Sequence, residues 1–307
     1  MPGPGERIVV FGDVIDDILV RPHGPIRADT DTPAAIRQRP GGSAANVAAW
    51  LGSLGAPVDF VGIVGAGDVS SHAAALEAQG VRAHLLADPE LPTGTIIVLI
   101  DENNTRTMLT ERGANVRLTP DCVDDALLAG AGGVHFTGYS VFSCGGAADE
   151  EGFRRLLERA HASGAVVSVD PSSAGFLADF GVERFLTTIR GADILLPNLD
   201  EGMVLTGLEE PTSVAARLSE WFPVVALTLG AAGTIVAVAG TEPVCLPVEA
   251  ALRTDSTGAG DAFSAGFLAA WLSDSGAATP LQRAVTAARA GGAAAANAIE
   301  LVGGRPD

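Results

Sequence analysis

The sequence predicts an α/β fold in which a mostly parallel sheet carries helices on both faces. Short apolar runs, typical of buried strands, alternate along the chain with longer segments of helical periodicity. The chain has 307 residues, of which 47% are hydrophobic and 18% are charged. This composition is too apolar for a disordered chain, and it is sufficient for one large domain covering residues 1–307.

The first part of the chain contains two strand-and-helix pairs. Residues 6–12 and 58–64 are short apolar runs that predict buried strands. Residues 43–54 and 70–79 have helical patterns, and each helix is followed by a glycine, Gly55 or Gly80, as is common at helix ends.

The same alternation resumes in the second part of the chain. The predicted strands are 133–136, 165–169, 193–196, 224–229 and 234–238. The predicted helices are 150–162, 198–206, 261–272 and 280–299, of which the last two are rich in Ala.

Two segments interrupt this alternation. Residues 17–40 contain short β-like pieces and several Pro, and residues 93–110 have the pattern of a hairpin that turns at Asp101-Glu-Asn-Asn104. Together they predict a small separate β-sheet; ordinary surface loops are the alternative.

The charge of the chain limits its partners. It has 37 acidic and 19 basic residues, a net charge of −18, and every basic residue is Arg. Such an acidic protein is a poor ligand for nucleic acid or anionic membranes. The absence of Lys excludes Schiff-base chemistry, pyridoxal phosphate enzymes and the Walker phosphate loop.

The remaining composition predicts a cytoplasmic protein. Cys122, Cys144 and Cys245 are odd in number and not at metal-site spacing, which favours reduced thiols. The start of the chain lacks the pattern of a signal peptide, and no apolar stretch is long enough to span a bilayer.

The most specific motif is Asp255-Ser-Thr-Gly-Ala-Gly-Asp261, followed by an apolar stretch in which Phe263, Phe267 and Trp271 recur every four residues. That spacing predicts a helix with one buried stripe, so the glycines lie at its amino terminus, where free N–H groups favour an anion. Asp261 is expected to stay ionised there and to accept a proton. The structural alternative is a Gly-rich turn with an acidic helix start.

Two more motifs suit a hydroxylated ligand. Pro40-Gly-Gly-Ser-Ala-Ala-Asn46 leads into a helix whose first turn places Asn46 to donate and accept hydrogen bonds. Gly12-Asp-Val-Ile-Asp-Asp17 follows the first strand, where open α/β sheets bind ligands. A plain helix start and solvated loop acids are the respective alternatives.

Two further motifs follow strands of the second part. Pro197-Asn-Leu-Asp-Glu201 places Asn198 and Glu201 on one helical turn, where they can hold Mg²⁺ or form a capping box. Thr228-Leu-Gly-Ala-Ala-Gly-Thr234 can wrap a nucleotide or make a tight turn. Gly62-Ile-Val-Gly-Ala-Gly67 lacks the spacing of a dinucleotide fingerprint.

In this order the motifs resemble the ribokinase-like (PfkB) family of carbohydrate kinases over nearly the whole chain. The segments 41–55 and 255–266 are similar to its two signatures, Asn198 and Glu201 to its Asn-x-x-Glu, and 228–233 to its nucleotide loop. The resemblance implies an ATP-dependent, Mg²⁺-dependent kinase with a Rossmann-like sheet. It also implies a β-sheet lid formed by about 17–40 and 91–112, through which a homodimer can form.

The resemblance also implies roles for individual residues. Asp261 is expected to be the base and the N–H groups of Gly258, Ala259, Gly260 and Asp261 the anion hole. The acceptor sugar would be bound by Asp13, Asp17, Gly42, Asn46 and Asn115. The nucleotide would lie along Asn198, Thr228, Gly230 and Gly233, with Glu201 at the Mg²⁺ end. Asp255 and Thr257 match positions that bind a monovalent cation such as K⁺ in some members.

Three departures from ribokinases place ribose in doubt as the acceptor: Ser43 replaces a Lys, Pro171-Ser-Ser173 lacks an Arg, and His135-Phe-Thr-Gly-Tyr139 lacks a Glu. The carboxylates of the predicted pocket favour a neutral polyhydroxylated acceptor over a sugar phosphate. Arginines of the predicted lid, if they reach the pocket, favour the phosphate. A nucleoside kinase of the same fold and a non-catalytic sugar- or nucleotide-binding protein are the alternatives.

Overall fold

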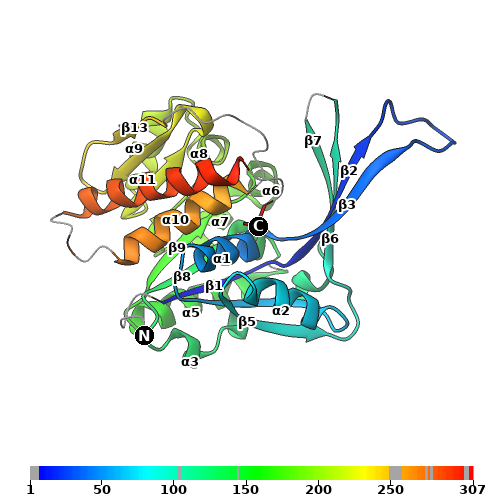
Figure 1. Cartoon of the computed structure of the whole chain (residues 1–307). Helices are drawn as coiled ribbons and strands as arrows, with labels where there is room; N and C mark the ends of the chain where they lie inside the picture. The colour runs from blue at the N-terminus through cyan, green and yellow to red at the C-terminus, as the bar shows by residue number, and fades with distance from the viewer. Residues whose placement is uncertain are drawn as a thin grey trace.

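Two sheets organise the protein, a main sheet in the body and a small sheet that projects from it (Figure 1). The structure is a computed structural model that describes residues 7–102, 105–143, 145–248, 258–273, 276, 279–300 and 304–306. The predicted α/β class and the predicted second sheet are both confirmed. No helix within these residues is long and apolar enough to cross a membrane.

The main sheet has nine strands in the described ranges, in the order β13-β12-β11-β10-β9-β8-β1-β4-β5. All neighbours from β11 to β5 are parallel, whereas β12 is antiparallel to β11 and to β13. The carboxyl ends of the parallel strands therefore meet at one edge. The strands are β1 (Ile8–Phe11), β4 (Val58–Gly65), β5 (Val81–Asp88), β8 (Gly133–Thr137), β9 (Val166–Asp170), β10 (Ile194–Leu195), β11 (Val224–Thr228), β12 (Thr234–Val238) and β13 (Val244–Leu246).

Helices cover both faces of the main sheet and bury two apolar clusters. One face packs against α1 (Ser43–Ser53), α2 (Val69–Glu77), α10 (Ala259–Ser273) and α11 (Pro280–Ala298). The other packs against α5 (Ala147–Ala162), α6 (Ala174–Phe180), α7 (Val182–Thr188), α8 (Leu199–Thr206) and α9 (Pro211–Ser219). The shorter helical segments are α3 (Asp125–Leu128), α4 (Gly138–Phe142), η1 (Gly113–Arg117), η2 (Pro120–Cys122) and η3 (Gly230–Ala232).

The small sheet has the order β3-β2-β6-β7 and consists of β2 (Ile15–Pro22), β3 (Ala34–Gly41), β6 (Gly94–Ile100) and β7 (Arg106–Glu111). The hairpin predicted at 93–110 is β6 and β7, which pair antiparallel. The short β-like pieces predicted at 17–40 are two regular eight-residue strands instead. Pro40 is tolerated because it lies on β3, the edge strand, where a missing N–H costs no ladder bond.

Strand β5 has no counterpart among the elements predicted from the sequence. It is the other edge of the main sheet, and it mixes polar and apolar residues that are exposed or half-buried, except for Val81 and Asp88 at its ends, which are buried. That pattern lacks the apolar run by which the buried strands were predicted.

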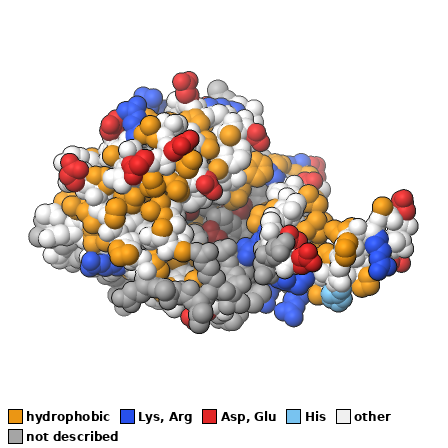
Figure 2. Space-filling view, turned by 90° about the horizontal axis from the view of Figure 1, so that it is seen from above, with side chains coloured by type: hydrophobic (Ala, Val, Ile, Leu, Met, Phe, Trp, Pro, Cys, Tyr) orange, Lys and Arg blue, Asp and Glu red, His pale blue; other side chains and the backbone are white. Residues whose placement is uncertain are grey.

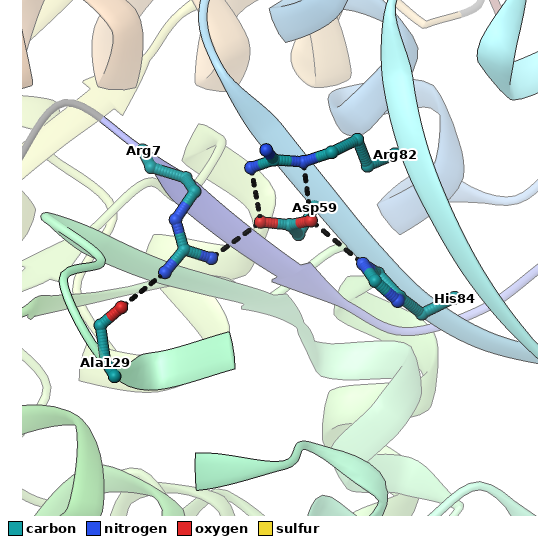
Figure 3. Close-up of polar contacts among 5 residues, drawn as sticks. All are labelled: Arg7, Asp59, Arg82, His84 and Ala129. Atoms are coloured by element: carbon teal, nitrogen blue, oxygen red, sulfur yellow. Dashed lines mark hydrogen bonds and ion pairs between the residues drawn. The ribbon is translucent and has the colours of Figure 1, made fainter. Parts of the chain in front are cut away.

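Asp59 joins β1, β4 and β5 at their amino ends, the edge opposite the candidate site (Figure 3). Its carboxylate, only 3% exposed, accepts hydrogen bonds from Arg7 at 2.6 Å and from Arg82 at 2.8 and 2.9 Å. His84 Nε2 lies 2.8 Å away, and Arg7 also donates to the carbonyl of Ala129. Burial raises the pKa of Asp59, but these bonds from His84, Arg7 and Arg82 outweigh burial and lower it.

Candidate active site

Helix α10 begins in the Gly-rich motif. Phe263, Phe267 and Trp271 are buried on it, as their spacing predicts. Gly258 precedes the helix with a φ of +74°, and a Cβ there would lie 2.5 Å from the carbonyl oxygen of Gly304. Glycine therefore meets both a conformational and a packing requirement at this position. The first N–H groups of the helix have no intrahelical partner, so they are available to an anion.

Asp261 lies in the first turn of α10 and is held by two side chains of α1. Ser43 Oγ donates to Asp261 Oδ1 at 2.7 Å, and Asn46 Nδ2 donates to Asp261 Oδ2 at 2.9 Å. The two signature motifs of the sequence, 215 and 218 residues apart at these contacts, thus meet at one carboxylate.

The electrostatics of Asp261 differ from the sequence-based expectation that it stays ionised. The pKa of Asp261 is raised to about 7, because burial, together with the nearby carboxylates of Asp170 and Asp13, outweighs the bonds from Ser43 and Asn46, which lower it. Desolvation therefore outweighs the favourable helix terminus. A carboxylate with a pKa near 7 is well matched to proton transfer at neutral pH.

Two cavities meet at Asp261. The smaller has a volume of about 120 Å³ and lies against the ends of β9, β10 and β11, and the larger has a volume of about 600 Å³ and lies between the body and the small sheet. The surface is visibly hollowed between these two parts (Figure 2). Four residues line both cavities, namely Ser43, Ser172, Gly258 and Asp261.

The larger cavity brings together all the residues predicted for the acceptor, Asp13, Asp17, Gly42, Asn46 and Asn115. The carboxylate of Asp17, on β2, has a pKa raised to about 6, because burial outweighs the positive charge of Arg305, which lowers it. Gly42 has a φ of +95° and leaves no room for a Cβ, which would lie 2.5 Å from the carbonyl oxygen of Asp13.

Two of these residues, Asp13 and Asn115, already make hydrogen bonds within the protein. The carboxylate of Asp13 accepts hydrogen bonds from the N–H groups of Ser43 and Ala44 and so caps α1. The amide of Asn115 accepts from the N–H of Val14 and donates to the carbonyls of Val14 and Arg112. Both side chains shape the cavity more than they offer free groups to a ligand.

The smaller cavity brings together Asn198, Glu201 and Thr228 with the start of α10. The structural alternative considered for Asn198 and Glu201, a capping box, is present: the Asn198 side chain accepts from the N–H of Glu201, and the Glu201 carboxylate accepts from the N–H of Asn198. The same box also fixes the carboxylate of Glu201 at the cavity wall.

Glu201 is a buried carboxylate with a second carboxylate near it. Burial first and the neighbouring carboxylate of Asp170 second raise the pKa of Glu201 to about 8, against the hydrogen bonds of Asn198, which lower it. Asp170 is also buried, with a pKa raised to about 6. Two buried carboxylates in one cavity fit a divalent cation, which offsets their charge. No group of three or more potential metal-binding side chains occurs among the described residues.

The remaining predicted residues lie outside the two cavities or outside the described ranges. Gly230 and Gly233 have φ values of +58° and +107° and form the turn after β11, but they do not line either cavity. Asp255 and Thr257, matched to a monovalent-cation site, lie outside the described residues.

The structure adds residues that the sequence reasoning did not assign. Asp170 ends β9 and Ser172 follows it, and Ser172 has a φ of +68°, unusual for a residue other than Gly. Tyr139 lines the larger cavity, and so do Arg39, Arg106 and Arg112, which belong to the lid arginines expected from the sequence to favour a phosphate if they reach the pocket. Arg305 lies beside Asn46. A charged residue after the last helix has no motif around it, so only the folded chain places it.

The family profile described as pfkB family carbohydrate kinase matches residues 6–305. The chain belongs to this family. Members are kinases, which implies ATP and usually Mg²⁺ as the cofactors.

Relatives of the chain have different named activities. The chain is 30% identical over 275 residues to the bifunctional protein HldE of Shewanella baltica, and the match covers 83% of this chain and 53% of HldE. The chain therefore spans about half the length of HldE. It is 29% identical over 290 residues to the ATP-dependent ribose-1-phosphate kinase of Halopiger xanaduensis, covering 94% of this chain and 90% of that one.

Solved structures of PfkB-type kinases superpose on nearly the whole chain. The probable sugar kinase of Rhizobium etli has a TM-score of 0.84 and 25% identity, covering 99% of this chain and 96% of that one. The adenosine kinase of Sinorhizobium meliloti has a TM-score of 0.82 and 27% identity, with the same coverage.

Proposed function

We propose that the protein is an ATP-dependent kinase that transfers the γ-phosphoryl group to a hydroxyl of a small sugar or sugar derivative. The observation that carries this proposal is the position of Asp261 and Gly258 in the walls of both cavities. Phosphoryl transfer requires a base and a group that stabilises the charge of the phosphoryl oxygens, and both lie here at the junction of the two cavities.

In the proposed step, Asp261 accepts the proton of the attacking hydroxyl as the bond from that oxygen to the γ-phosphorus forms. The bond from the γ-phosphorus to the bridging oxygen of ADP breaks. The N–H groups of Gly258, Ala259, Gly260 and Asp261 would stabilise the charge on the phosphoryl oxygens. A Lys-free chain would thus use backbone dipoles in place of a phosphate-binding Lys.

The nucleotide end would consist of Asn198 and Thr228, with Gly230 and Gly233 shaping the turn beside it. Glu201 and Asp170 would hold Mg²⁺, directly or through waters, and the metal would supply positive charge at the phosphates. The K⁺ site suggested for Asp255 and Thr257 stays a proposal, and rates measured in K⁺ and in Na⁺ would test it.

The small sheet would act as a lid over the acceptor. Its strands contribute residues to the wall of the larger cavity, among them Leu19, Ile96 and Met108. Closure over a bound acceptor would exclude water, which otherwise competes for the phosphoryl group.

A nucleoside is the second candidate acceptor. Ile96, Val98 and Met108 form an apolar stretch of the larger cavity wall, and Tyr139 and Phe176 add two aromatic rings. Such a wall would favour an acceptor that carries a base. A volume of about 600 Å³ also exceeds what a single sugar ring requires, since it lies within the range of pockets for drug-sized ligands.

The charged residues of the larger cavity bear on the charge of the acceptor. Asp17 and Asn46 favour a neutral polyol, whose hydroxyls can donate to the carboxylate. Arg39, Arg106 and Arg112 line the same cavity and favour an acceptor with a phosphate.

The experiment is a kinase assay with ATP and Mg²⁺ over ribose, fructose, adenosine, ribose 1-phosphate and fructose 6-phosphate. Transfer to any of them supports the proposed function, and ADP release with no acceptor phosphorylated contradicts it. A protein that binds ATP and a sugar with no turnover would be the non-catalytic alternative. Arg106→Gln should lower kcat/KM only for phosphorylated acceptors if the arginines select them.

We further propose a homodimer formed through the small sheet. Side chains alternate between the two faces of a strand, so the face opposite the cavity carries Ile18, Val20, Ile36, Ile97, Leu99 and Leu109. Ile36 is 65% exposed and Leu109 is 54% exposed. A second copy is the occupant we favour, because the centre of this face is apolar and its carboxylates, Asp16 and Glu111, lie at the strand ends next to the body. Two such apolar faces can meet where the rest of a chain with net charge −18 repels its copy.

Sedimentation velocity tests this dimer with Leu109→Glu. The substitution should convert a dimer into a monomer, because it would bury a carboxylate in the interface. Leu208→Glu, at an exposed leucine outside the small sheet, is the matched control and should leave the dimer intact. A wild-type protein that sediments as a monomer contradicts the proposal.

A further inference from the structure

Residues 304–306 lie against both signature motifs of the site. The carbonyl oxygen of Gly304 accepts a hydrogen bond of 3.0 Å from Trp50 Nε1 on α1. Gly304 also lines the larger cavity and is the residue that a Cβ on Gly258 would strike. The backbone of this segment is therefore anchored beside the base and the anion-binding helix start.

The anchor places the guanidinium of Arg305 inside the protein, where the residue is only 8% exposed. Its Nε donates to Oδ1 of Asn46 at 3.1 Å, and its Nη2 donates to the carbonyl of Gly41 at 2.7 Å. Nη1 is buried and makes no hydrogen bond to any residue in the described ranges.

These contacts form a relay to Asp261. An Asn amide can present either its oxygen or its nitrogen in a given direction, whereas a guanidinium can only donate. Because Arg305 donates to Oδ1 of Asn46, the Nδ2 group is left facing the other way, and it donates to Oδ2 of Asp261 at 2.9 Å. Arg305 therefore fixes which end of the Asn46 amide faces the base.

The charge of Arg305 acts on the same carboxylate. Burial lowers the pKa of Arg305 to about 10, while the charges of Asp17, Asp13, Asp261 and Asp16 oppose that shift. The guanidinium therefore stays positive at neutral pH. Interaction between charges is reciprocal, so the cation favours the ionised form of each of these carboxylates.

Apart from three arginines of the small-sheet region, the other titratable groups around Asp261 are acidic or neutral. Within the described residues, several charged or titratable side chains act on Asp261 or line the same two cavities. They are Asp13 after β1, Asp17 on β2, Tyr139 on α4, Asp170 on β9, Glu201 on α8, and Arg39, Arg106 and Arg112 of the small-sheet region. Arg305 differs from the three cavity arginines because its contact runs through Asn46 to the base itself.

We propose that Arg305 is a positioning residue for phosphoryl transfer, which orients the Asn46 amide toward Asp261 and supplies the positive charge that keeps the Asp261 carboxylate able to accept a proton. The inference rests on the proposed kinase function. It assigns a role in the reaction to a segment outside every motif of the sequence.

The test compares the pH profiles of kcat/KM for wild type, Arg305→Met and Arg305→Lys with the best acceptor. Loss of the charge should raise the pKa of the base. The acidic limb of the Arg305→Met profile should therefore move to higher pH by about one unit, which lowers kcat/KM about tenfold at pH values below that pKa. Arg305→Lys keeps the charge and loses the fork geometry, so its limb should stay near that of wild type while its kcat falls.

Arg283→Met is the matched control for a general loss of stability. Arg283 also donates to a backbone carbonyl, that of Trp271, at 2.7 Å, but it lies on α11 away from both cavities. Its pH profile should be that of wild type. The affinity for ATP should be the same in all four proteins, as measured by calorimetry.

A double substitution separates action through Asp261 from any other effect. In an Asp261→Asn background, adding Arg305→Met should change kcat by less than about twofold if Arg305 acts through the base, since residues that act as a unit are not additive. An unmoved limb in Arg305→Met, or full additivity with Asp261→Asn, overturns the inference. If Arg305→Met does not fold, Arg305→Gln takes its place in both comparisons. A wild-type protein without kinase activity would instead refute the proposed function.

Discussion

Ser43 Oγ lies 2.7 Å from Asp261 Oδ1 and donates a hydrogen bond to it. From the sequence, Ser43 stands where ribokinases carry a Lys. The structure connects its hydroxyl to the carboxylate of Asp261. Ser43 also lines both cavities, so it lies where the proposed nucleotide and acceptor would meet.

Replacing Ser43 with Ala should move the pH dependence of the reaction. The bond from Ser43 lowers the pKa of Asp261, which is raised to about 7 chiefly by burial, so its loss should raise that pKa further. Activity requires the deprotonated form, so the acidic limb of kcat/KM should move to higher pH by several tenths to about one unit. Ser43→Thr keeps the hydroxyl and should retain the wild-type limb. Identical limbs in Ser43→Ala and Ser43→Thr would show that this bond does not tune the base.

Glu201→Gln should raise the Mg²⁺ concentration required for half-maximal rate and leave acceptor affinity unchanged. The carboxylate of Glu201 lines only the smaller cavity, and Gln keeps its size without its charge. A steady-state Mg²⁺ titration measures the effect, with the exposed neighbour Asp200→Asn as the control. Loss of acceptor affinity with an unchanged Mg²⁺ requirement would place Glu201 in the acceptor half of the site.

Asp59→Asn should destabilise the fold without altering the site. Its loss removes charge-assisted bonds from Arg7 and Arg82 and should lower the free energy of unfolding by about 1.5–3 kcal/mol at pH 7. The exposed pair of Arg154 and Glu158 offers a control, since Glu158→Gln should cost only about 0.3–0.5 kcal/mol.

The difference for Asp59 should depend on pH. Its folded-state pKa is lowered, so the stabilisation is present above the ordinary Asp pKa of about 4 and is lost as pH falls through the folded value. Urea unfolding at pH 7 and at pH 3 measures this. A difference between wild type and Asp59→Asn that grows toward pH 3 would contradict the account.

The sequence was sufficient to predict most of the fold, because its buried strands and Ala-rich helices have strong apolar patterns. Strands β11 and β12 and helix α11 end within a residue or two of their predicted bounds. Strand β5 was missed because it is an edge strand that mixes polar and apolar residues. Strands β2 and β3 were predicted as fragments, since their regularity comes from pairing with β6 and with each other.

The candidate site was predicted where residues lie in motifs and missed where only folding brings them close. Asp261 and Asn46 stand in recognisable signatures, and the structure places them 2.9 Å apart between Oδ2 and Nδ2. Arg305 stands outside every motif, and its contact with Asn46 spans 259 residues of sequence. The pKa of Asp261 could not be predicted either, because it depends on burial among carboxylates from several strands.

Asp261→Asn tests the central claim, that Asp261 is the base between the two cavities. Asn keeps the size of the side chain but cannot take the proton, so turnover should fall by about 10²–10⁴ while the affinity for ATP stays unchanged. The measurement is single-turnover phosphorylation of the acceptor, which reports the chemical step, with the exposed acid variant Asp179→Asn as the control. The loss expected for a base is about hundredfold or greater. A variant that retains more than about a tenth of the wild-type single-turnover rate would therefore contradict the account.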